Sequence, residues 1–323
     1  MFSRRDVLFA ATAAGVTALF RPITAAFARA SQPSTPVDFA VPADACDCHT
    51  HIFGDPRRFP FSPARVYTPE TASIAETRAL HKTLHIRRIV VVQPTVYGTD
   101  NSCTIDAVKQ LAPNSRGAVM IDEKETTDAI LADMDHAGIR AIRINLETVG
   151  LSNPSAARQR LQAAAGRIKG SKWHIEIYTR PSVIEAIKDQ VLASPVPVSF
   201  DHFGGAQAAL GVQQPGFGAL LDLLRSGKAY VKISAAYRAS TEAPDYPDVA
   251  PLAKALIAAN PERILWGTDW PHPAQIKGRK AMEITPLWQI DDGRIFNQLP
   301  VWAPDPTQRK TILVENPARL YGF

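Results

Sequence analysis

The amino-acid sequence predicts a (β/α)₈ barrel of the TIM type, built as a single domain over residues 44–323. The first observation is that short apolar runs alternate with helix-length segments along this whole range. Parallel strands need a crossover connection, which is usually a helix, so this alternation favours a parallel sheet. Eight runs are expected as strands, namely Ala45–Phe53, Arg88–Gln93, Gly117–Ile121, Ile139–Asn145, Trp173–Thr179, Val196–His202, Ala229–Ser234 and Ile264–Asp269.

An open, doubly wound sheet would show the same alternation, and two further observations favour a closed barrel. Arg143 and Asn145 on the fourth strand, and Glu176 and Tyr178 on the fifth, are polar at alternate positions, as expected for side chains that point into an enclosed interior. The candidate functional residues also follow strand ends, where barrel enzymes build their sites. In addition, no G-x-G-x-x-G follows a strand, which argues against a dinucleotide-binding fold.

Helices are expected between the strands, where apolar residues recur at helical spacing. The expected helices are Thr71–Leu84, Asp128–Ala137, Ala156–Lys169, Pro181–Leu192, Gly218–Ser226, Asp248–Ala259 and Asp305–Glu315. Asp100 and Asn101 are expected to cap one further helix. A long aromatic loop follows the first strand, and a proline-rich excursion, Pro271–Pro304, follows the eighth.

The composition is that of an ordinary globular protein, with 46% hydrophobic and 21% charged residues. The net charge of +5 does not come from a run of Lys and Arg, so no nucleic-acid partner is expected. The three cysteines are too few for a disulfide scaffold, and Cys46 and Cys48 are expected to pack without a bridge.

Residues 1–30 are expected to be a twin-arginine signal peptide. Arg4 and Arg5 precede an apolar run, Val7–Phe20, that is too short to span a bilayer comfortably, and Ala28-Arg29-Ala30 offers small residues for cleavage. A retained N-terminal anchor is the alternative. After cleavage we expect a periplasmic protein, delivered by the twin-arginine export machinery, with no stable membrane association. Residues 31–43, which contain three prolines, are expected to be an extended linker.

The strongest chemical signal is the segment Asp47-Cys48-His49-Thr50-His51 on the first strand. Alternation along a strand would place Asp47, His49 and His51 on one face and the other two residues on the opposite face. Two imidazoles that project together suit a metal ion, an oxyanion or a proton in transfer. Two neighbouring structural histidines would give the same short motif, and the residues that follow later strands favour a functional site.

Four motifs, in this order along residues 44–323, resemble the amidohydrolase-related proteins (amidohydrolase family 2). They are Asp47-Cys48-His49-Thr50-His51 on the first strand, Phe200-Asp201-His202 on the sixth, Gly267-Thr268-Asp269-Trp270-Pro271-His272-Pro273 on the eighth, and Asn316-Pro317-Ala318-Arg319-Leu320-Tyr321 in the tail. The stretch from Gln93 to Asn101 is similar to the branch that holds 2-pyrone-4,6-dicarboxylate lactonase, sulfomuconolactone hydrolase and galactarolactone isomerase.

The resemblance implies a barrel that hydrolyses a bond at a carbonyl group. His49 and His51 match the first-strand pair of the family, His202 its sixth-strand histidine, and Asp269 the eighth-strand aspartate that activates water. These residue types suit the chemistry, because lactone hydrolysis needs a deprotonated water, a polarised carbonyl and a donor for the leaving oxygen.

Three other polar residues in or near these motifs are expected to be structural. Asp201 is expected to hold a loop, and His174 and His272 to support the site or to lie in the bottom layer of the barrel.

No cofactor is expected, although a divalent metal such as zinc remains an alternative, held by His49, His51 and Asp269. Metal-dependent amidohydrolases commonly have a ligand at the end of the fifth strand. Here that end is Tyr178, and His174 lies about 13 Å earlier at ~3.3 Å per residue. The dicarboxylate-lactonase branch is understood to work without a divalent metal, and the resemblance therefore implies metal-independent chemistry.

The substrate is expected to be a small anionic lactone, of the sugar-acid or pyrone-dicarboxylate type. Arg143, Arg180 and Arg238 each follow or end a strand and could pair with a carboxylate, and Arg143 has the inward parity. Further substrate contacts are expected from Tyr178, Tyr97, Asn101 and Ser234. The stretch Leu146–Gly150 lacks the additional arginine of the dicarboxylate lactonases, which counts against 2-pyrone-4,6-dicarboxylate itself.

Three other functions remain open from the sequence. A lactone isomerase would move a proton or an acyl group without net addition of water. A decarboxylase would release carbon dioxide and would need a metal. A periplasmic sugar-acid binding protein would use the same pocket without turnover.

Overall fold

The computed structural model describes residues 30–274, 276 and 278–323. All but the last residue of the expected signal peptide therefore lies outside the described residues. Within the described part, the protein has no helix that combines the length and the apolar character needed to cross a membrane.

Eight parallel strands form one sheet in the order β1-β3-β4-β5-β6-β7-β8-β9. The strands are β1 Cys46–Thr50, β3 Arg88–Val92, β4 Ser115–Val119, β5 Ile139–Asn145, β6 His174–Tyr178, β7 Val198–Phe200, β8 Ala229–Ser234 and β9 Ile264–Gly267. The sheet closes where its ends meet, because Asp269 N donates to His49 O and His51 N donates to Trp270 O, both at 2.8 Å. The predicted (β/α)₈ barrel is confirmed.

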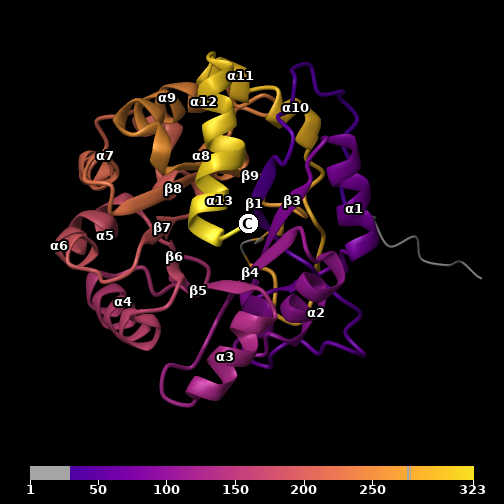
Figure 1. The fold of residues 1–323 in the computed structure, drawn as a ribbon. Coiled ribbons are helices and arrows are strands. Elements are labelled where there is room, and N and C mark those ends of the chain that lie inside the picture. Colours follow the sequence, from indigo (N-terminus) through magenta and orange to yellow (C-terminus); the bar gives the residue numbers. More distant parts are fainter. Residues whose placement is uncertain (1–29, 275, 277) are drawn as a thin grey trace, which may run out of the picture.

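Helices surround the ring of strands, as Figure 1 shows. Within the described residues, the α-helices are α1 Ile74–Thr83, α2 Ser102–Leu111, α3 Asp128–His136, α4 Pro154–Ile168, α5 Pro181–Ala186, α6 Lys188–Leu192, α7 Phe217–Arg225, α8 Ala236–Ala239, α9 Ala250–Ala259, α10 Asp292–Phe296, α11 Leu299–Trp302, α12 Pro306–Lys310 and α13 Asn316–Tyr321.

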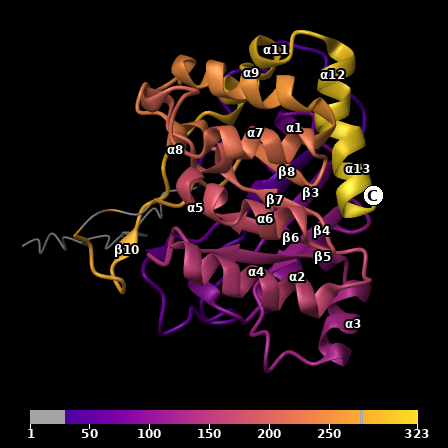
Figure 2. The same ribbon diagram turned by 90° about the vertical axis from the view of Figure 1, so that its left-hand side faces the viewer.

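The two ends of the barrel differ in what covers them. Figure 2 places α13 at one end and β10, Ile284–Thr285, at the other. β10 pairs in parallel with β2, Thr68–Pro69, so the aromatic loop after β1 and the proline-rich excursion after β9 are joined. This small sheet therefore lies at the carboxyl ends of the barrel strands, where the predicted site residues are.

Side-chain caps explain where several helices begin. Ser73 and Glu76 form a reciprocal capping box at α1, and Thr127 and Asn153 each accept a backbone hydrogen bond at the start of α3 and α4. Asn101 does precede α2, as expected, but its side chain makes no capping bond. Its amide bonds to the backbone of Met120 instead.

Most helix ends lie within about three residues of their expected positions, but two expected helices differ by more than this. The segment expected as one helix from Pro181 to Leu192 is divided into α5 and α6 at Ile187, whose φ of −108° is not helical. The last helix is expected to end at Glu315, but a π-helical turn, Thr311–Glu315, leads directly into α13. Pro317 lies in the first turn of α13 and has no N–H to donate to a carbonyl of the preceding π-helical turn.

The barrel interior and the outer shell form separate cores. The larger core lies between strands and helices, and a smaller one fills the barrel interior. The interior cluster contains Cys46, Cys48, Val90, Val92, Ala118, Ala141, Tyr230, Leu265, Leu320 and Tyr321. All three cysteines are free and buried, as expected. The inward parity of β5 and β6 is also confirmed, because Arg143 pairs in register with Glu176 and Asn145 with Tyr178.

The prediction that Asp47 shares a face with His49 and His51 is wrong, whereas the two histidines do project together, toward Asp269. The register between β1 and β3 shifts between Asp47 and Thr50, which breaks the strict alternation of side chains. Cys48 packs in the barrel interior, and His49 reaches Lys232 there. Asp47 points away from the two histidines of the motif, because its carboxylate bonds to Thr268 of the neighbouring chain segment and to His81 of α1.

The segment before the barrel packs along the outside of the fold. Trp270 Nε1 donates to Ser31 O at 2.8 Å, and the hydroxyls of Ser34 and Thr35 each donate to Asp291 at 2.6 Å. Farther along, Asp38 N donates to the side chain of Asn297. Residues 31–43 contain no helix or strand, and these bonds fasten them to the loop after β9 and to α10.

Candidate active site

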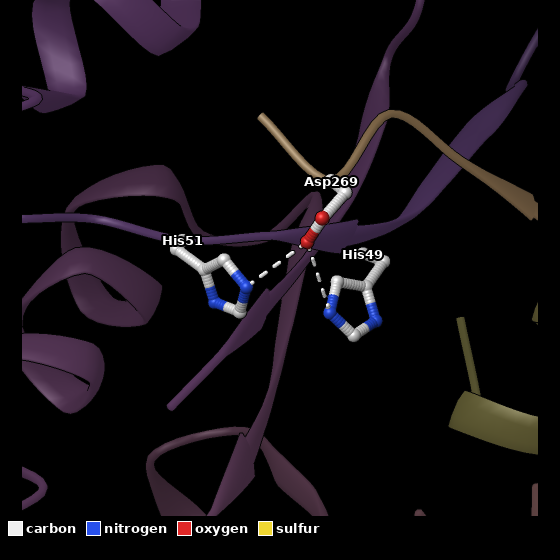
Figure 3. A group of neighbouring side chains, drawn as sticks. All are labelled: His49, His51 and Asp269. Atoms are coloured by element: carbon white, nitrogen blue, oxygen red, sulfur yellow. Dashed lines mark hydrogen bonds and ion pairs between the residues drawn. The ribbon is translucent and has the colours of Figure 1, made fainter. Parts of the chain in front are cut away.

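Asp269 is the centre of the site, and its two carboxylate oxygens have different partners. Oδ2 accepts hydrogen bonds from Tyr237 Oη at 2.5 Å and from Arg238 Nε at 2.7 Å. Oδ1 lies 3.2 Å from His51 Nε2, 3.5 Å from His49 Nε2 and 3.8 Å from His202 Nε2. Figure 3 shows the two imidazoles of β1 on either side of this oxygen. The structure thus brings together the four side chains expected to be catalytic.

The backbone at the strand ends aims these side chains. Asp269, His202 and His272 all have positive φ, at 65°, 50° and 62°. Residues other than glycine adopt this left-handed region at a cost, and such positions cluster at functional sites. The closing hydrogen bonds between β1 and the segment after β9 then set Asp269 directly beside the two histidines.

Hydrogen bonds at the far side of each ring orient the two histidines that face the pocket. His51 Nδ1 lies 2.7 Å from the carbonyl oxygen of Val92, which can only accept, so the proton is on Nδ1 and Nε2 faces Asp269 with its lone pair. His202 Nδ1 lies 2.9 Å from Ser234 Oγ. Burial lowers the pKa of His51 to about 4 and holds the pKa of His202 well below its usual value.

The charge on Asp269 is stabilised by its neighbours. Burial opposes ionisation, but the guanidinium of Arg238, which donates to Oδ2, outweighs it and holds the pKa of Asp269 well below its ordinary value. The carboxylate is therefore ionised at neutral pH. Oδ1 and the lone pair of His51 Nε2 face each other, and a proton placed between them would be shared by both atoms.

Beneath this cluster lies a buried ionic network that includes a lysine the sequence analysis did not select. Lys232, on β8, is fully buried, and its Nζ lies 2.8 Å from Glu176 Oε2 and 3.2 Å from Asp201 Oδ1. It also lies 3.1 Å from His49 Nδ1. The expectation that Asp201 holds a loop is wrong, because both of its carboxylate oxygens face this network instead.

The predicted supporting roles of two histidines agree with the structure. His174 lies in the barrel interior, 3.4 Å from Glu176 and with its ring 4.8 Å from that of Tyr321. His272 Nε2 lies 3.0 Å from Asp292 of α10, and its ring is 5.3 Å from that of Tyr237. Neither residue lines the pocket at Asp269.

A polar pocket opens in front of Asp269. Its lining consists of His51, Tyr67, Pro94, Thr95, Arg143, Asn145, Thr148, Tyr178, His202, Arg238, Asp269 and Pro273. Arg143 is buried, and its Nη1 donates to the carbonyl oxygen of Gln93 at 2.7 Å. Its Nε has no hydrogen-bond partner among the described residues. Since a buried guanidinium donor needs an acceptor, this wall of the pocket suits an anionic group.

Several residues expected to contact substrate have other partners in the structure. Arg238 lines the pocket, but its charge is paired with Asp269. Arg180 lines a neighbouring cavity, is about half exposed and pairs with Glu147. The polar groups of Tyr97, Asn101 and Ser234 bond to Gly54 N, to the Met120 backbone and to His202, and none of the three lines the pocket.

Comparison with known proteins gives the family. Residues 46–323 match the sequence family described as amidohydrolase. The chain belongs to the amidohydrolase family. It is 35% identical over 300 residues to 2-pyrone-4,6-dicarboxylate hydrolase from Comamonas testosteroni, a match that covers 90% of this chain and 94% of the relative. It is 34% identical over 289 residues to 4-sulfomuconolactone hydrolase from Rhizobium radiobacter, covering 90% and 93%.

Two further matches extend the comparison. D-galactarolactone isomerase from Agrobacterium fabrum is 26% identical over 284 residues, covering 87% of this chain and 92% of the relative. A ligand-free crystal structure from Agrobacterium tumefaciens has a TM-score of 0.73 at 26% identity, covering 88% of this chain and 97% of that chain. This amidohydrolase thus shares its barrel, almost end to end, with the proteins that it is similar to.

The donor atoms of this amidohydrolase test whether a metal would fit. Two groups of described side chains have ligand atoms within 4.8 Å of one another, namely His49, His51 and Asp269, and His49, Asp201 and His202. Both groups depend on His49. An ammonium group, Lys232 Nζ, occupies its Nδ1, and Tyr178 stands at the end of β6 where a further ligand would be expected. His49 Nδ1, the ring nitrogen beside Asp201, is therefore not free, and the group of His49, His51 and Asp269 can hold an ion only where His49 Nε2 carries no proton.

Two residues at the site of this amidohydrolase, Lys232 and Tyr237, were not predicted from the sequence. Lys232 lies two residues before Ser234 on the same strand, so the parity argument that selected Arg143 would also have selected it. Tyr237 follows Ala235, whose φ is 53°, and this turn at the end of β8 aims its hydroxyl at Asp269. No pattern in the sequence indicates that turn.

Proposed function

We propose that this amidohydrolase hydrolyses the ring of a small anionic lactone. The observation that carries the proposal is the pairing, in one pocket, of an ionised carboxylate, Asp269, with a buried guanidinium, Arg143, whose Nε has no partner among the described residues. The first group suits activation of water and the second suits binding of a substrate carboxylate. The names of two relatives, both lactone hydrolases, support the same reaction.

In the proposed reaction a water molecule in the pocket donates hydrogen bonds to Asp269 Oδ1 and His51 Nε2, which lie 3.2 Å apart, and gives up a proton as its oxygen attacks the lactone carbonyl. Tyr178 lines the pocket, and burial raises the pKa of its phenol, so it stays protonated and serves as a hydrogen-bond donor to the substrate. Collapse of the tetrahedral intermediate breaks the ring C–O bond. The proton taken from water returns to the leaving oxygen, and the product is an open-chain hydroxy acid or its keto tautomer.

The proposed substrate has one carboxylate held at Arg143. Arg143 Nη2 lies 3.7 Å from Asp201 Oδ2, whereas two other arginines near the pocket have closer partners, Arg238 in Asp269 at 2.7 Å and Arg180 in Glu147 at 2.5 Å. The loop after β5, Leu146–Gly150, supplies no arginine. A lactone with a single carboxylate near the ring therefore fits the charges of the pocket better than a dicarboxylate does.

The proposed reaction needs no metal. A lactone panel that contains monocarboxylate and dicarboxylate rings, read with a pH indicator, tests both the activity and the charge of the substrate. We expect acid release with the monocarboxylate lactones, at a rate that a chelator leaves unchanged. Loss of activity with the chelator, and its return with added zinc, would contradict the metal-free reaction.

Product analysis separates the alternatives, of which isomerisation is favoured by the likeness to D-galactarolactone isomerase. Chromatography against the authentic ring-opened acid distinguishes hydrolysis from isomerisation, and carbon dioxide release would indicate a decarboxylase. Binding without any product would indicate a sugar-acid binding protein.

The Asp269→Asn variant tests the role of the carboxylate. We expect kcat to fall by roughly 10²–10⁴, the usual contribution of a general base, because an amide cannot accept the proton from water. Asp222→Asn is the matched control, since this carboxylate is about half exposed and pairs with Lys188 on the surface. Unchanged turnover in Asp269→Asn would exclude the proposed base.

We also propose that the protein is exported to the periplasm by the twin-arginine route. The twin arginines, Arg4 and Arg5, and the apolar run after them support this. Fractionation of cells that express the full chain tests it: the parent is expected in the periplasmic fraction, and a variant with both arginines changed to lysine is expected to stay in the cytoplasm.

A further inference from the structure

We propose that Lys232 is a positioning residue that fixes the proton of His49 on Nε2. The role of Lys232 in catalysis rests on the proposed function, lactone hydrolysis at Asp269. Its consequence is that His49 acts as a hydrogen-bond donor behind Asp269 and offers no lone pair to a metal ion.

The contact between Lys232 and His49 has one possible direction. Lys232 Nζ and His49 Nδ1 are 3.1 Å apart with hydrogen-bond geometry, and an ammonium group only donates. Nδ1 must therefore supply the lone pair, and a neutral imidazole then carries its proton on Nε2. Asp201 Oδ1 lies at a similar distance, 3.3 Å, but neither oxygen of that carboxylate makes a hydrogen bond within the described part of the chain.

The surroundings of Lys232 keep it charged and in place. Its side chain is fully buried on β8, between Glu176 Oε2 at 2.8 Å and Asp201 Oδ1 at 3.2 Å. Glu176 is itself held by Tyr321 of α13, whose Oη donates to Glu176 Oε1 at 2.7 Å. This helix lies at the end of the barrel opposite β10. The two carboxylates offset the charge of the ammonium, so this lysine is fixed from both sides and cannot turn away from His49.

The proton on His49 Nε2 points toward Asp269 Oδ1. Nε2 is buried, makes no hydrogen bond within the described residues, and lies 3.5 Å from Asp269 Oδ1. His49 does not line the pocket, whereas His51, His202 and Asp269 do. The N–H dipole therefore supports the charge on Oδ1 from the interior side and leaves the pocket side of that oxygen for water.

The same proton explains why the two candidate ion-binding groups are incomplete. Each contains His49, and with Nδ1 bonded to Lys232 and Nε2 protonated this ring has no lone pair to offer. Removal of Lys232 would let Nδ1 donate to Asp201 instead, and Nε2 would then be free beside His51 and Asp269. A single substitution should thus convert this cluster into a zinc site.

The first experiment reads the tautomer in the parent protein, without any variant of the network. In protein labelled with ¹⁵N at histidine, long-range proton–nitrogen correlation spectra distinguish a protonated Nδ1 from a protonated Nε2, and the signals of His49 are identified by their loss in His49→Asn. We expect protonation at Nε2. Protonation at Nδ1 would overturn the proposal.

The second experiment measures zinc content after purification in the presence of zinc. We expect Lys232→Met to hold on the order of tenfold more zinc than the parent, and Lys232→Met/His49→Asn to lose it again. Lys188→Met, which removes a lysine from a surface ion pair, is the matched control. Equal zinc in the parent and in Lys232→Met would contradict the inference.

A buried charge is removed in Lys232→Met, so Lys232→Met/Glu176→Gln is made in parallel to remove one of the carboxylates left unpaired. If neither variant folds, the tautomer in the parent still decides. Neither readout depends on turnover, so an inactive protein with Nε2 protonated would refute the proposed function alone, and an active protein with Nδ1 protonated would refute the role of Lys232 alone.

Discussion

At the scale of single residues, the site works through the separation of the two oxygens of Asp269. Tyr237 and Arg238 hold Oδ2, and Oδ1 faces the histidines and the pocket. A carboxylate with one oxygen held by two donors cannot rotate, so the other oxygen keeps its direction toward the water that it is proposed to activate. The cost is basicity, because the same donors lower the pKa of Asp269.

Tyr237→Phe tests this division. We expect kcat to fall about tenfold, with KM little changed, because the hydrogen bond positions the carboxylate and Tyr237 does not line the pocket. Kinetics with the best lactone of the panel measure both parameters. Tyr246→Phe is the control, since this buried tyrosine lies outside the pocket lining. A change in KM alone would instead indicate that the Tyr237 hydroxyl acts on substrate binding.

The lowered pKa of buried His51 makes the free energy of unfolding depend on pH. Burial lowers the pKa of His51 from 6.5 to about 4, so the unfolded chain binds a proton more readily than the folded one between these values. Stability contributed by neutral His51 is therefore present above pH 6.5 and is lost as the pH falls toward 4. This fall in the pKa of His51 corresponds to a loss of stability on the order of 3 kcal/mol.

Urea unfolding at a series of pH values between 7 and 4 measures this loss. We expect the parent to lose more free energy of unfolding across the range than His51→Gln, in which the titrating group is absent. The pKa of His202 is lowered in the same direction and contributes to the slope in both proteins. Equal slopes in the two proteins would mean that His51 does not titrate as described.

At the scale of elements, the closing contact between β1 and β9 decides whether the site forms. The backbone of the two strands approaches closely at Gly267, where a β-carbon would lie 2.8 Å from His49 N and 2.9 Å from His49 Cβ. Only glycine allows this approach without a shift of one strand. The distance between Asp269 and the histidines of β1 is set a few residues beyond this point.

Gly267→Ala tests the importance of this approach. We expect a loss of about 1–3 kcal/mol in the free energy of unfolding, as for an overpacked core, together with a fall in kcat because Asp269 moves relative to His49. Thermal and urea unfolding measure the first effect. Gly218→Ala is the matched control: this glycine lies in α7, a β-carbon there would meet no atom within 4 Å, and the change is expected to be neutral or stabilising.

At the scale of the whole molecule, the segment before the barrel is connected to the site through α10. Asp291 caps α10 and accepts hydrogen bonds from Ser34 and Thr35, which contribute to a pKa of about 2 for its carboxyl. The next residue, Asp292, pairs with His272, which packs against Tyr237. Contacts thus run from residues 31–43 to the donors that hold Asp269.

Asp291→Ala is expected to loosen this segment. Backbone amides of residues 34–38 should exchange with deuterium faster than in the parent, because Thr35 N loses its acceptor and α10 loses its cap. Hydrogen-exchange mass spectrometry measures this. Asp305→Ala, which removes the cap of α12 instead, is the control and should leave residues 34–38 unchanged. Unchanged exchange in Asp291→Ala would show that other contacts hold the segment.

The sequence by itself determined the class of fold and the identity of most site residues. Eight apolar runs with helices between them favour parallel strands, and the carboxyl ends of such strands meet at one face. Among the polar residues at those ends, the resemblance to the amidohydrolase family then selected His49, His51, His202 and Asp269. These inferences depend on local periodicity, chain order and short motifs, all of which the sequence contains directly.

Only the tertiary structure decided which of these residues face the substrate and what supports them. The register shift in β1, the turn that aims Tyr237 and the burial of Lys232 between two carboxylates all depend on contacts between segments far apart in the chain. Polar side chains such as those of Arg238, Asn101 and Ser234 can pair with substrate or with protein equally well. The hydrogen-bond partner of such a side chain is the group that lies within about 3 Å after folding. That distance depends on tertiary contacts and cannot be inferred from the local sequence.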